Sequence, residues 1–419
     1  MKKNIKAFLP CAIMLALMTA CESSGKLSEK TQSGLLTEKF DSVINGKKTA
    51  LYILKNNSGM EVCITNYGGR VVSVIVPDKK GRPTDVVLGY DNVAQYADIK
   101  NSPSDYGSTV GRYANRINQG RLTISGKTYQ LPRNNFGHCL HGGTEGWMYK
   151  VYDANQINDS TLVLTIDSPD GDNGFPGNVK AKATYTLTSD NALDIVFEAV
   201  TDKETVINMT NHCYFNLNGE PDKEGTDMVL YINANHFTPS DSTYMTTGEI
   251  LPVDGTPMDF RKPHALKETI NDTTYLQIKN ASGYDHNWCL NTYRNGKGND
   301  KEVCASLYSP KTGIMLEVFT NEPGLQVYSG NFQGTGISCK HGVKYPKHVS
   351  VCLESQKYPD TPNKPHWPSA SLKPGDKYYS HLVYKFSKKK KKQINMELLD
   401  WIVIVIFFMA LIGIILWVV

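Results

Sequence analysis

Apolar and polar residues alternate along much of the chain between Leu36 and Ser387, and turn sequences interrupt this pattern repeatedly. A period of two places apolar side chains on one face of an extended strand, whereas an amphipathic helix needs a period of about 3.6. In Arg121–Leu131, two alternating runs flank the dipeptide Ser125-Gly126, as in a two-residue hairpin. The pattern predicts an all-β protein, a large antiparallel β-sandwich.

Other segments of the same region support this fold class. No long amphipathic helix, tandem repeat or linker-like composition interrupts it, so residues 37–387 are predicted to form one domain. The clearest predicted strands are Val71–Val76, Thr161–Ile166, Lys182–Leu187 and Ala192–Val200.

The first 36 residues have a different character. Residues 1–20 combine early lysines with the short apolar run Phe8–Met18, which is typical of an export signal. Small residues just before Cys21 resemble a bacterial lipoprotein signal, in which Cys21 becomes the acylated N-terminus. The alternative is an ordinary cleaved signal with an incidental cysteine. Residues 21–36 are polar and are predicted to be a flexible tether.

The C-terminal segment, residues 388–419, is also distinct from the domain. Five lysines, Lys388–Lys392, precede the uncharged stretch Trp401–Val419, which is long enough for a transmembrane helix. Lysines on the exported side of such a helix would oppose the positive-inside bias. Residues from Met396 onward resemble the first helix of a sodium/solute symporter. We therefore hypothesise a fusion or frameshift into a neighbouring transporter gene.

Charge and cysteine content exclude several classes of function. The whole chain has 45 basic and 41 acidic residues, but residues 21–387, without the two ends, have 37 and 39, a net charge of −2. The domain has no basic cluster that would suggest nucleic-acid binding. The seven cysteines of the domain form no CxxC motif, and their odd number favours neither a disulfide framework nor a zinc site. No metal is predicted.

Five short segments hold more polar and ionisable residues than a sandwich core requires. Each segment also has a purely structural interpretation. The spacing of His138 and His141 alone is weak evidence for a metal site. Arg116 could form a surface ion pair, and His212 could be a hydrogen-bonded histidine of the core. Glu354 follows an apolar run, so it either turns outward or is buried with a raised pKa. The segments are Gly111–Ile117, His138–Gly143, Asn208–Leu217, Gly283–Asn287 and Tyr345–Gln356.

Taken together, and in this order along the chain, these segments resemble one family. The matching stretches are Thr65–Arg70, Gly111–Ile117, Leu140–Gly143, Ser168–Gly171 with Phe175–Gly177, Thr210–Leu217, Tyr284–Asn287, Tyr328–Phe332, Tyr345–His348 and Cys352–Gln356 with Pro359-Asp360. From about Phe40 to Phe386 the chain is similar to the aldose 1-epimerases (galactose mutarotases). The resemblance implies the supersandwich fold of that family.

The resemblance also implies a reaction and roles for particular residues. Aldose 1-epimerases interconvert the α and β anomers of free aldohexoses such as glucose and galactose, without a cofactor. Glu354 would be the base at the C1 hydroxyl, and His212 the acid at the ring oxygen. The remaining expected sugar contacts are His141, as a second donor near the ring oxygen, and Asn115, Arg116, Asp285 and Gln326 at the hydroxyls.

Two other functions remain open from the residues. A glycoside hydrolase would use Glu354 and Asp285 as a carboxylate pair, and a non-catalytic sugar-binding lipoprotein would use the same polar groups. In each case we expect an exported, membrane-anchored lipoprotein facing the periplasm or cell surface. The tail suggests a functional link to a sugar symporter, which an anomer-interconverting enzyme would supply with its preferred anomer.

Overall fold

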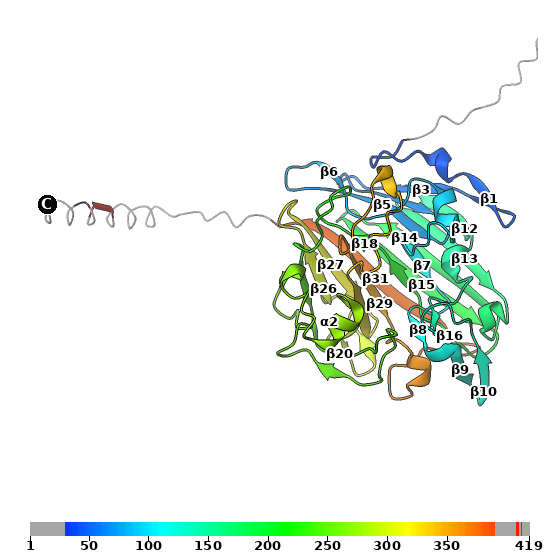
Figure 1. Cartoon of the computed structure of the whole chain (residues 1–419). Helices are drawn as coiled ribbons and strands as arrows, with labels where there is room; N and C mark the ends of the chain where they lie inside the picture. Colours follow the sequence, from blue (N-terminus) through cyan, green and yellow to red (C-terminus); the bar gives the residue numbers. More distant parts are fainter. Residues whose placement is uncertain (1–29, 390–407, 410–411, 413–419) are drawn as a thin grey trace, which may run out of the picture.

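The computed structural model describes residues 30–389, 408–409 and 412 (Figure 1). Paired strands dominate the described chain, and all of the named strand pairs run antiparallel. The fold is the all-β sandwich that the sequence predicts.

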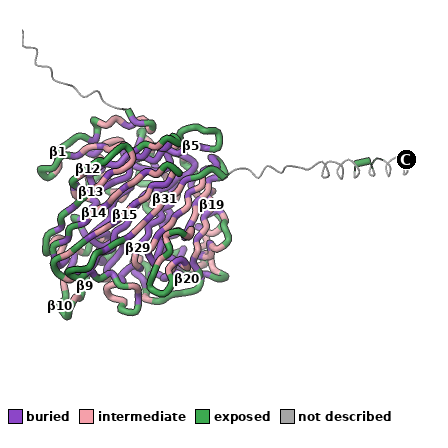
Figure 2. Tube along the Cα trace, turned by 180° about the vertical axis from the view of Figure 1, so that it is seen from behind, coloured by how far each residue is buried: buried purple, intermediate pink, exposed green. Residues whose placement is uncertain are grey.

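The largest sheet has nine strands in the order β12-β13-β14-β15-β31-β27-β26-β19-β22. Buried residues alternate with less buried ones along β14 (Figure 2) and along β27, so one face of the sheet packs into the interior. The strands are β12 (Asp153–Asn158), β13 (Thr161–Ser168), β14 (Val179–Leu187), β15 (Ala192–Thr201), β31 (Tyr378–Lys388), β27 (Ile314–Thr320), β26 (Ala305–Tyr308), β19 (Val229–Ile232) and β22 (His264–Ala265).

A six-stranded sheet, ordered β18-β29-β28-β23-β20-β21, supplies the other side of the main core. Tyr185 and Phe197 of the nine-stranded sheet belong to the same apolar cluster as Trp288 and Leu353 of this sheet. The two sheets therefore share one hydrophobic core. The strands are β18 (Tyr214–Phe215), β29 (Val351–Gln356), β28 (Gly324–Tyr328), β23 (Asp285–Leu290), β20 (Ala234–Thr238) and β21 (Leu251–Pro252).

Smaller elements complete the described fold. A four-stranded sheet consists of β3 (Leu51–Lys55), β4 (Glu61–Thr65), β5 (Arg70–Pro77) and β6 (Pro83–Asp85). Two-strand pairs are β1 (Ser42–Ile44) with β2 (Lys47–Thr49), β7 (Ser108–Val110) with β17 (Thr210–His212), β8 (Arg116–Ile117) with β11 (Cys139–Leu140), β9 (Arg121–Ile124) with β10 (Lys127–Gln130), β16 (Thr205–Val206) with β30 (Ser371–Leu372), and β24 (Tyr293–Arg294) with β25 (Lys297–Gly298). The α-helices are short: α1 (Val93–Ala97) and α2 (Leu276–Ala281). Single turns of 3-10 helix cover Thr37–Phe40, Asn118–Gly120, Trp147–Tyr149, Asp172–Gly174, Leu266–Glu268, Lys340–Gly342 and Thr361–Asn363.

The predicted hairpin is confirmed. β9 and β10 pair across Ser125 and Gly126, whose φ angles are 49° and 77°. Positive φ at both central positions is the geometry of a type I′ turn, whose twist matches that of the flanking strands. The four other predicted strands lie within β5, β13, β14 and β15.

The predicted boundaries of the domain need correction. Residues 30–36, assigned to the tether by their polar composition, pack on the domain: Leu35 is 3% exposed, and the Gln32 amide donates to Glu61 Oε1 at 2.7 Å. Leucine burial here overrides the polar composition. At the other end, β31 extends to Lys388, the first lysine of the run.

The predicted signal peptide, Cys21 and most of residues 388–419 lie outside the described residues. Within the described part of the chain, no helix combines the length and apolar character that crossing a membrane requires.

Candidate active site

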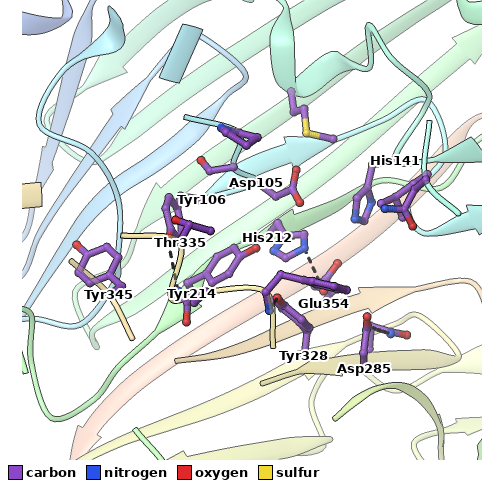
Figure 3. Close-up of a pocket in the computed structure, with 18 of the residues that line it drawn as sticks. Asp105, Tyr106, His141, His212, Tyr214, Asp285, Tyr328, Thr335, Tyr345 and Glu354 are labelled. Atoms are coloured by element: carbon purple, nitrogen blue, oxygen red, sulfur yellow. Dashed lines mark hydrogen bonds and ion pairs between the residues drawn. The ribbon is translucent and has the colours of Figure 1, made fainter. Parts of the chain in front are cut away.

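All seven side chains that the sequence predicts for sugar chemistry line one cavity of about 570 Å³. They come from six separate segments of the chain, so only the folded protein brings them together. They are Asn115, Arg116, His141, His212, Asp285, Gln326 and Glu354. Figure 3 labels His141, His212, Asp285 and Glu354 among them.

Three neighbouring strands of the six-stranded sheet form one wall of the cavity. Asp285 begins β23, Gln326 lies in β28, and Glu354 lies in β29. In the register, Gln326 stands opposite both Asn287 and Glu354. Directly opposed residues share a face, as do residues two apart in one strand, so these side chains all project toward the cavity. Leu353, next to Glu354, points into the apolar core instead.

The remaining groups come from two short strands and two loops: Arg116 begins β8 and His212 ends β17, while Asn115 directly precedes β8 and His141 directly follows β11. Asn115 and His141 have φ angles of 65° and 51°, a left-handed conformation that is uncommon outside glycine. The Asn115 amide donates to His141 Nδ1 at 3.1 Å, which ties the two loops together. Gly142 also has positive φ, and a Cβ there would lie 2.3 Å from the Gly111 carbonyl oxygen. The loops therefore meet too closely for a side chain at position 142.

The centre of the cavity is a contact between an acid and a base. His212 Nε2 lies 3.5 Å from Glu354 Oε1, and the two side chains are 5% and 2% exposed (Figure 3). Burial raises the pKa of Glu354 well above its ordinary range, and nearby Asp285 and Asp105 add to this effect. Burial also lowers the pKa of His212. Of the two readings of Glu354, the buried one is correct.

One further polar atom of each member of this pair has no partner. Within the described residues, His212 Nδ1 and Glu354 Oε2 are buried and have no hydrogen-bond partner. Buried polar atoms in native proteins are nearly always paired, so exceptions call for an explanation such as a bound molecule or a catalytic role. Here both residues line a cavity, which favours a functional explanation.

His141 is held as a neutral hydrogen-bond donor. A backbone N–H can only donate, so the contact from Asn115 leaves Nδ1 without a proton and places the proton on Nε2. Burial lowers the pKa of His141 to about 3, which keeps the ring uncharged near neutrality. Its ring meets that of His212 edge-to-face, with centroids 5.3 Å apart.

Amide side chains fix the orientation of the sugar-contact groups. Gln326 Nε2 donates to Asp285 Oδ1 at 2.7 Å, and Gln326 Oε1 accepts from Gln356 Nε2 at 3.2 Å. Asn115 Nδ2 donates in turn to Gln356 Oε1 at 3.4 Å. The chain of bonds determines which end of each amide faces its neighbour, so Gln356 positions two predicted binding residues.

Arg116 lines the cavity and packs against a cluster of aromatic side chains. Its Nε and Nη2 atoms donate to Asn135 Oδ1 at 3.2 and 2.9 Å, and its guanidinium lies 5.0 Å from the centre of the Tyr244 ring. Phe136 and Phe332 complete the cluster and are 53% and 51% exposed. Arg116 is therefore held by the Asn135 amide and the Tyr244 ring. The alternative interpretation, that Arg116 forms a surface ion pair, is wrong.

Several lining residues were missed by the sequence reasoning. Tyr214 stacks on His212 with centroids 5.0 Å apart, and Tyr328 stands edge-on to Tyr214. Both tyrosines lie in stretches that match the family, but nothing in the sequence indicated that they face the cavity. Asp105 also lines it, from a polar loop that gave no signal at all.

Other motif residues are structural. Arg112 donates to the carbonyls of Ser168, Pro176 and Gly177, so it joins the Gly111–Ile117 segment to the loops before β14. His138 accepts from the Gln119 amide and contacts Thr243 Oγ1, outside the cavity. All seven cysteines of the domain are free, and six of them are buried, as expected of small apolar residues.

One group within the described residues has the composition of a cation site. Asp105, His141 and His212 each offer an atom within 4.8 Å of the other two. Coordination by His141 Nε2 would require the ring to lose the proton that the Asn115 contact places there. The donor arrangement therefore fits a hydrogen-bonding role better than metal binding.

Comparison with known proteins identifies the family. A sequence model of the aldose 1-epimerases matches residues 50–385. The chain belongs to the aldose 1-epimerase family. It is 37% identical over 348 residues to the galactose mutarotase of Sus scrofa, covering 83% of this chain and 97% of that protein. For the aldose 1-epimerase of Escherichia coli, the identity is 36% over 345 residues, with coverage of 82% and 96%.

Solved structures of the aldose epimerase group share the fold. The galactose 1-epimerase of Lactobacillus acidophilus superposes with a TM-score of 0.72 at 30% identity, covering 83% of this chain and 97% of that one. A GalM/aldose epimerase homologue from C. elegans gives a TM-score of 0.74 at 29% identity, covering 82% and 100%. The sandwich is thus the fold of the aldose 1-epimerases.

The buried carboxyl of Glu354 generates a prediction about stability. Because its pKa is raised in the folded protein, its contribution to stability is complete at low pH and is lost as pH rises through the folded pKa. We expect Glu354→Gln to stabilise the protein at pH 8 by about 1–3 kcal/mol, with a much smaller effect at pH 4. Urea unfolding of both proteins at the two pH values measures this. A variant less stable than wild type at pH 8 would contradict it.

Proposed function

We propose that the protein is an aldose 1-epimerase that interconverts the α and β anomers of free aldohexoses by acid–base opening and closing of the ring. The observation that carries the proposal is the buried contact between His212 Nε2 and Glu354 Oε1, 3.5 Å apart in a cavity with unpaired atoms on both groups. Family membership supports the same activity.

The reaction needs one base and one acid. Glu354, as the carboxylate, removes the proton of the C1 hydroxyl; the C1–O5 bond breaks, a C1 carbonyl forms, and protonated His212 delivers its proton to O5. The open-chain aldehyde turns about the C1–C2 bond, and the reverse transfers close the ring on the other face. His141, a neutral donor at Nε2, would hydrogen-bond the ring oxygen as charge develops there.

The environment of the pair suits this exchange. Burial raises the pKa of Glu354 and lowers that of His212, so the Glu354 carboxylate is a stronger base, and the His212 imidazolium a stronger acid, than either would be in water. A stronger base at the C1 hydroxyl and a stronger acid at the ring oxygen each favour proton transfer to or from the substrate. Both groups return to their starting states after each cycle, so no cofactor is required.

The other residues are proposed to hold the part of the sugar that does not react. Asp285 accepts from Gln326 and has oxygen lone pairs left for sugar hydroxyls, while Arg116 offers further N–H donors. Phe332 lines the cavity, is backed by Tyr244, and gives an apolar face of the kind on which a pyranose ring can pack. Firm contacts at the distal hydroxyls leave C1 free to turn.

Substitution of either member of the pair tests the mechanism. We expect Glu354→Gln and His212→Asn each to lower kcat by about 10²–10⁴-fold with little change in KM, because each removes a proton-transfer group and leaves the distal contacts intact. Polarimetry of freshly dissolved α-glucose and α-galactose gives the rates. Asp153→Asn, at an exposed ion pair with Lys47, is the control and should match wild type.

Other results of that assay separate the competing functions. Turnover unchanged in either variant would refute the role assigned to that residue. Release of reducing ends from an oligosaccharide would indicate a glycoside hydrolase. Sugar binding with no acceleration of mutarotation would indicate a binding protein.

We further propose that the enzyme is an exported lipoprotein anchored through Cys21. The export-like residues 1–20 and the small residues before Cys21 support this. A functional link to a sugar symporter, and an origin of residues 388–419 by fusion or frameshift, are supported by the symporter-like sequence after Met396. An enzyme outside the inner membrane would supply such a transporter with whichever anomer it prefers.

Lipid attachment is tested with a chain that ends at Lys389, so that the hydrophobic tail cannot anchor it. We expect this chain to fractionate with membranes and to incorporate labelled palmitate, and Cys21→Ser to lose both properties. Palmitate incorporation that persists in the variant would contradict the proposal.

A further inference from the structure

A carboxylate that the sequence did not single out lies beside the two histidines. Asp105 lines the cavity, and one of its oxygens is within 4.8 Å of a ring nitrogen of both His141 and His212 (Figure 3). It lies in the loop just before β7, and His212 at the end of β17 pairs with Ser108 of β7. Strand pairing thus brings the loop to the histidine side of the cavity.

The backbone around Asp105 is held in place by buried groups. Arg70, which is fully buried, donates from Nη1 to the carbonyl oxygens of Ser104 and Tyr106 at 3.2 and 3.0 Å, on either side of Asp105. The amide and hydroxyl of Ser108 both donate to the Asp105 carbonyl oxygen, at 3.0 and 2.9 Å. A loop residue anchored from both sides can place its carboxylate reproducibly.

The charges near the two catalytic groups are distributed unequally. Of the charged side chains that act on His212, Asp105 has the largest effect and favours the imidazolium, followed by Asp285. For Glu354 the order is reversed: Asp285 acts most strongly, Asp105 less, and Arg116 favours the carboxylate. Arg116 on β8 acts on His141 and Glu354. The ionisable groups around His212 itself are Asp105 before β7, His141 after β11, Glu354 on β29, Asp285 on β23, Arg70 on β5, Tyr214 on β18 and Tyr328 on β28.

This distribution addresses a problem that burial creates. A buried pair favours the neutral state, with the proton on Glu354, but ring opening requires an ionised Glu354 and a protonated His212. Asp105 has an oxygen within 4.8 Å of a ring nitrogen of His212, and Glu354 is not part of that cluster. The negative charge of Asp105 therefore favours the productive arrangement, with the proton on His212. Because His141 is neutral, it does not offset the negative charge of Asp105, which therefore acts on His212.

We propose that Asp105 is a positioning residue that keeps the catalytic proton on His212 while Glu354 is ionised. The inference rests on the proposed function of the pair. Asp105 acts through the imidazole and exchanges no proton with the sugar.

Removing the charge should change the pH dependence of catalysis in a defined direction. Loss of a nearby negative charge makes protonation of the pair less favourable, so both limbs of the profile of kcat/KM against pH should move to lower pH. In Asp105→Asn, a smaller fraction of the enzyme would be in the productive state, with His212 protonated and Glu354 ionised. For Asp105→Asn we therefore expect kcat to fall about tenfold or more, with little change in KM.

The experiment compares four forms of the enzyme: wild type, Asp105→Asn, Asp105→Glu and Asp98→Asn. Asp105→Glu keeps the charge and should recover most of kcat and the wild-type pH profile. Asp98 lies in the same loop, accepts hydrogen bonds from Asn101 and does not line the cavity, so Asp98→Asn is the matched control for charge and should behave as wild type. Circular dichroism and thermal unfolding confirm that each form is folded.

A second readout needs no turnover. The ring resonances of His212, assigned by their loss in His212→Asn, are followed against pH by NMR in wild type and Asp105→Asn. We expect the imidazolium of His212 to lose its proton at lower pH in Asp105→Asn. If wild type fails to accelerate mutarotation but this titration shifts, the proposed function fails and the electrostatic role of Asp105 stands.

The remaining outcomes overturn the inference. Asp105→Asn with wild-type kcat and an unshifted profile would show that the carboxylate has no role. Raised KM with an unshifted profile and unshifted His212 titration would make Asp105 a sugar contact instead. Activity that depends on added Zn²⁺ and is removed by a chelator would make the three groups a metal site.

Discussion

The burial of a carboxylate next to an imidazole is the constraint on which the rest of the structure depends. Glu354 and His212 are almost fully enclosed, 3.5 Å apart, and each keeps an unpaired atom within the described structure. Such an arrangement costs free energy in a folded protein, because buried charges and unpaired polar atoms are both unfavourable. The large shared core of the two sheets supplies the stability that allows it.

Pairing between strands is what converts a distributed set of residues into a site. The register of β23, β28 and β29 places Asp285, Gln326 and Glu354 on one face, and the alternate residues of the same strands fill the core. A shift of one residue in this register would exchange the two sets. The same pairing rule brings β17 beside β7 and so sets His212 next to the loop that carries Asp105.

The fold and the principal side chains of the site could be predicted from the sequence for specific physical reasons. Period-two alternation predicted strands such as β14 and β15, and the Ser125-Gly126 turn predicted its hairpin. Family-like stretches pointed to Glu354 and His212, and the structure brings these together with the other five predicted residues. Asp105 could not be found, because its importance comes from tertiary proximity to two histidines. The ordered segment around Leu35 was missed because local composition does not show what a leucine packs against.

The central claim is that the ring opens and closes by proton transfer. The most direct test measures two things at C1 of the sugar: the exchange between anomers and the replacement of the C1 oxygen by oxygen from water. [1-¹³C]Galactose is incubated with the purified enzyme in H₂¹⁸O, and NMR measures both exchange between the two anomeric signals and the isotope shift that ¹⁸O causes at C1. Ring opening by proton transfer predicts faster anomer exchange than in the blank, with ¹⁸O entering C1 no faster than without enzyme. Uptake of ¹⁸O in step with anomer exchange would mean displacement at C1 by water, and would contradict the account.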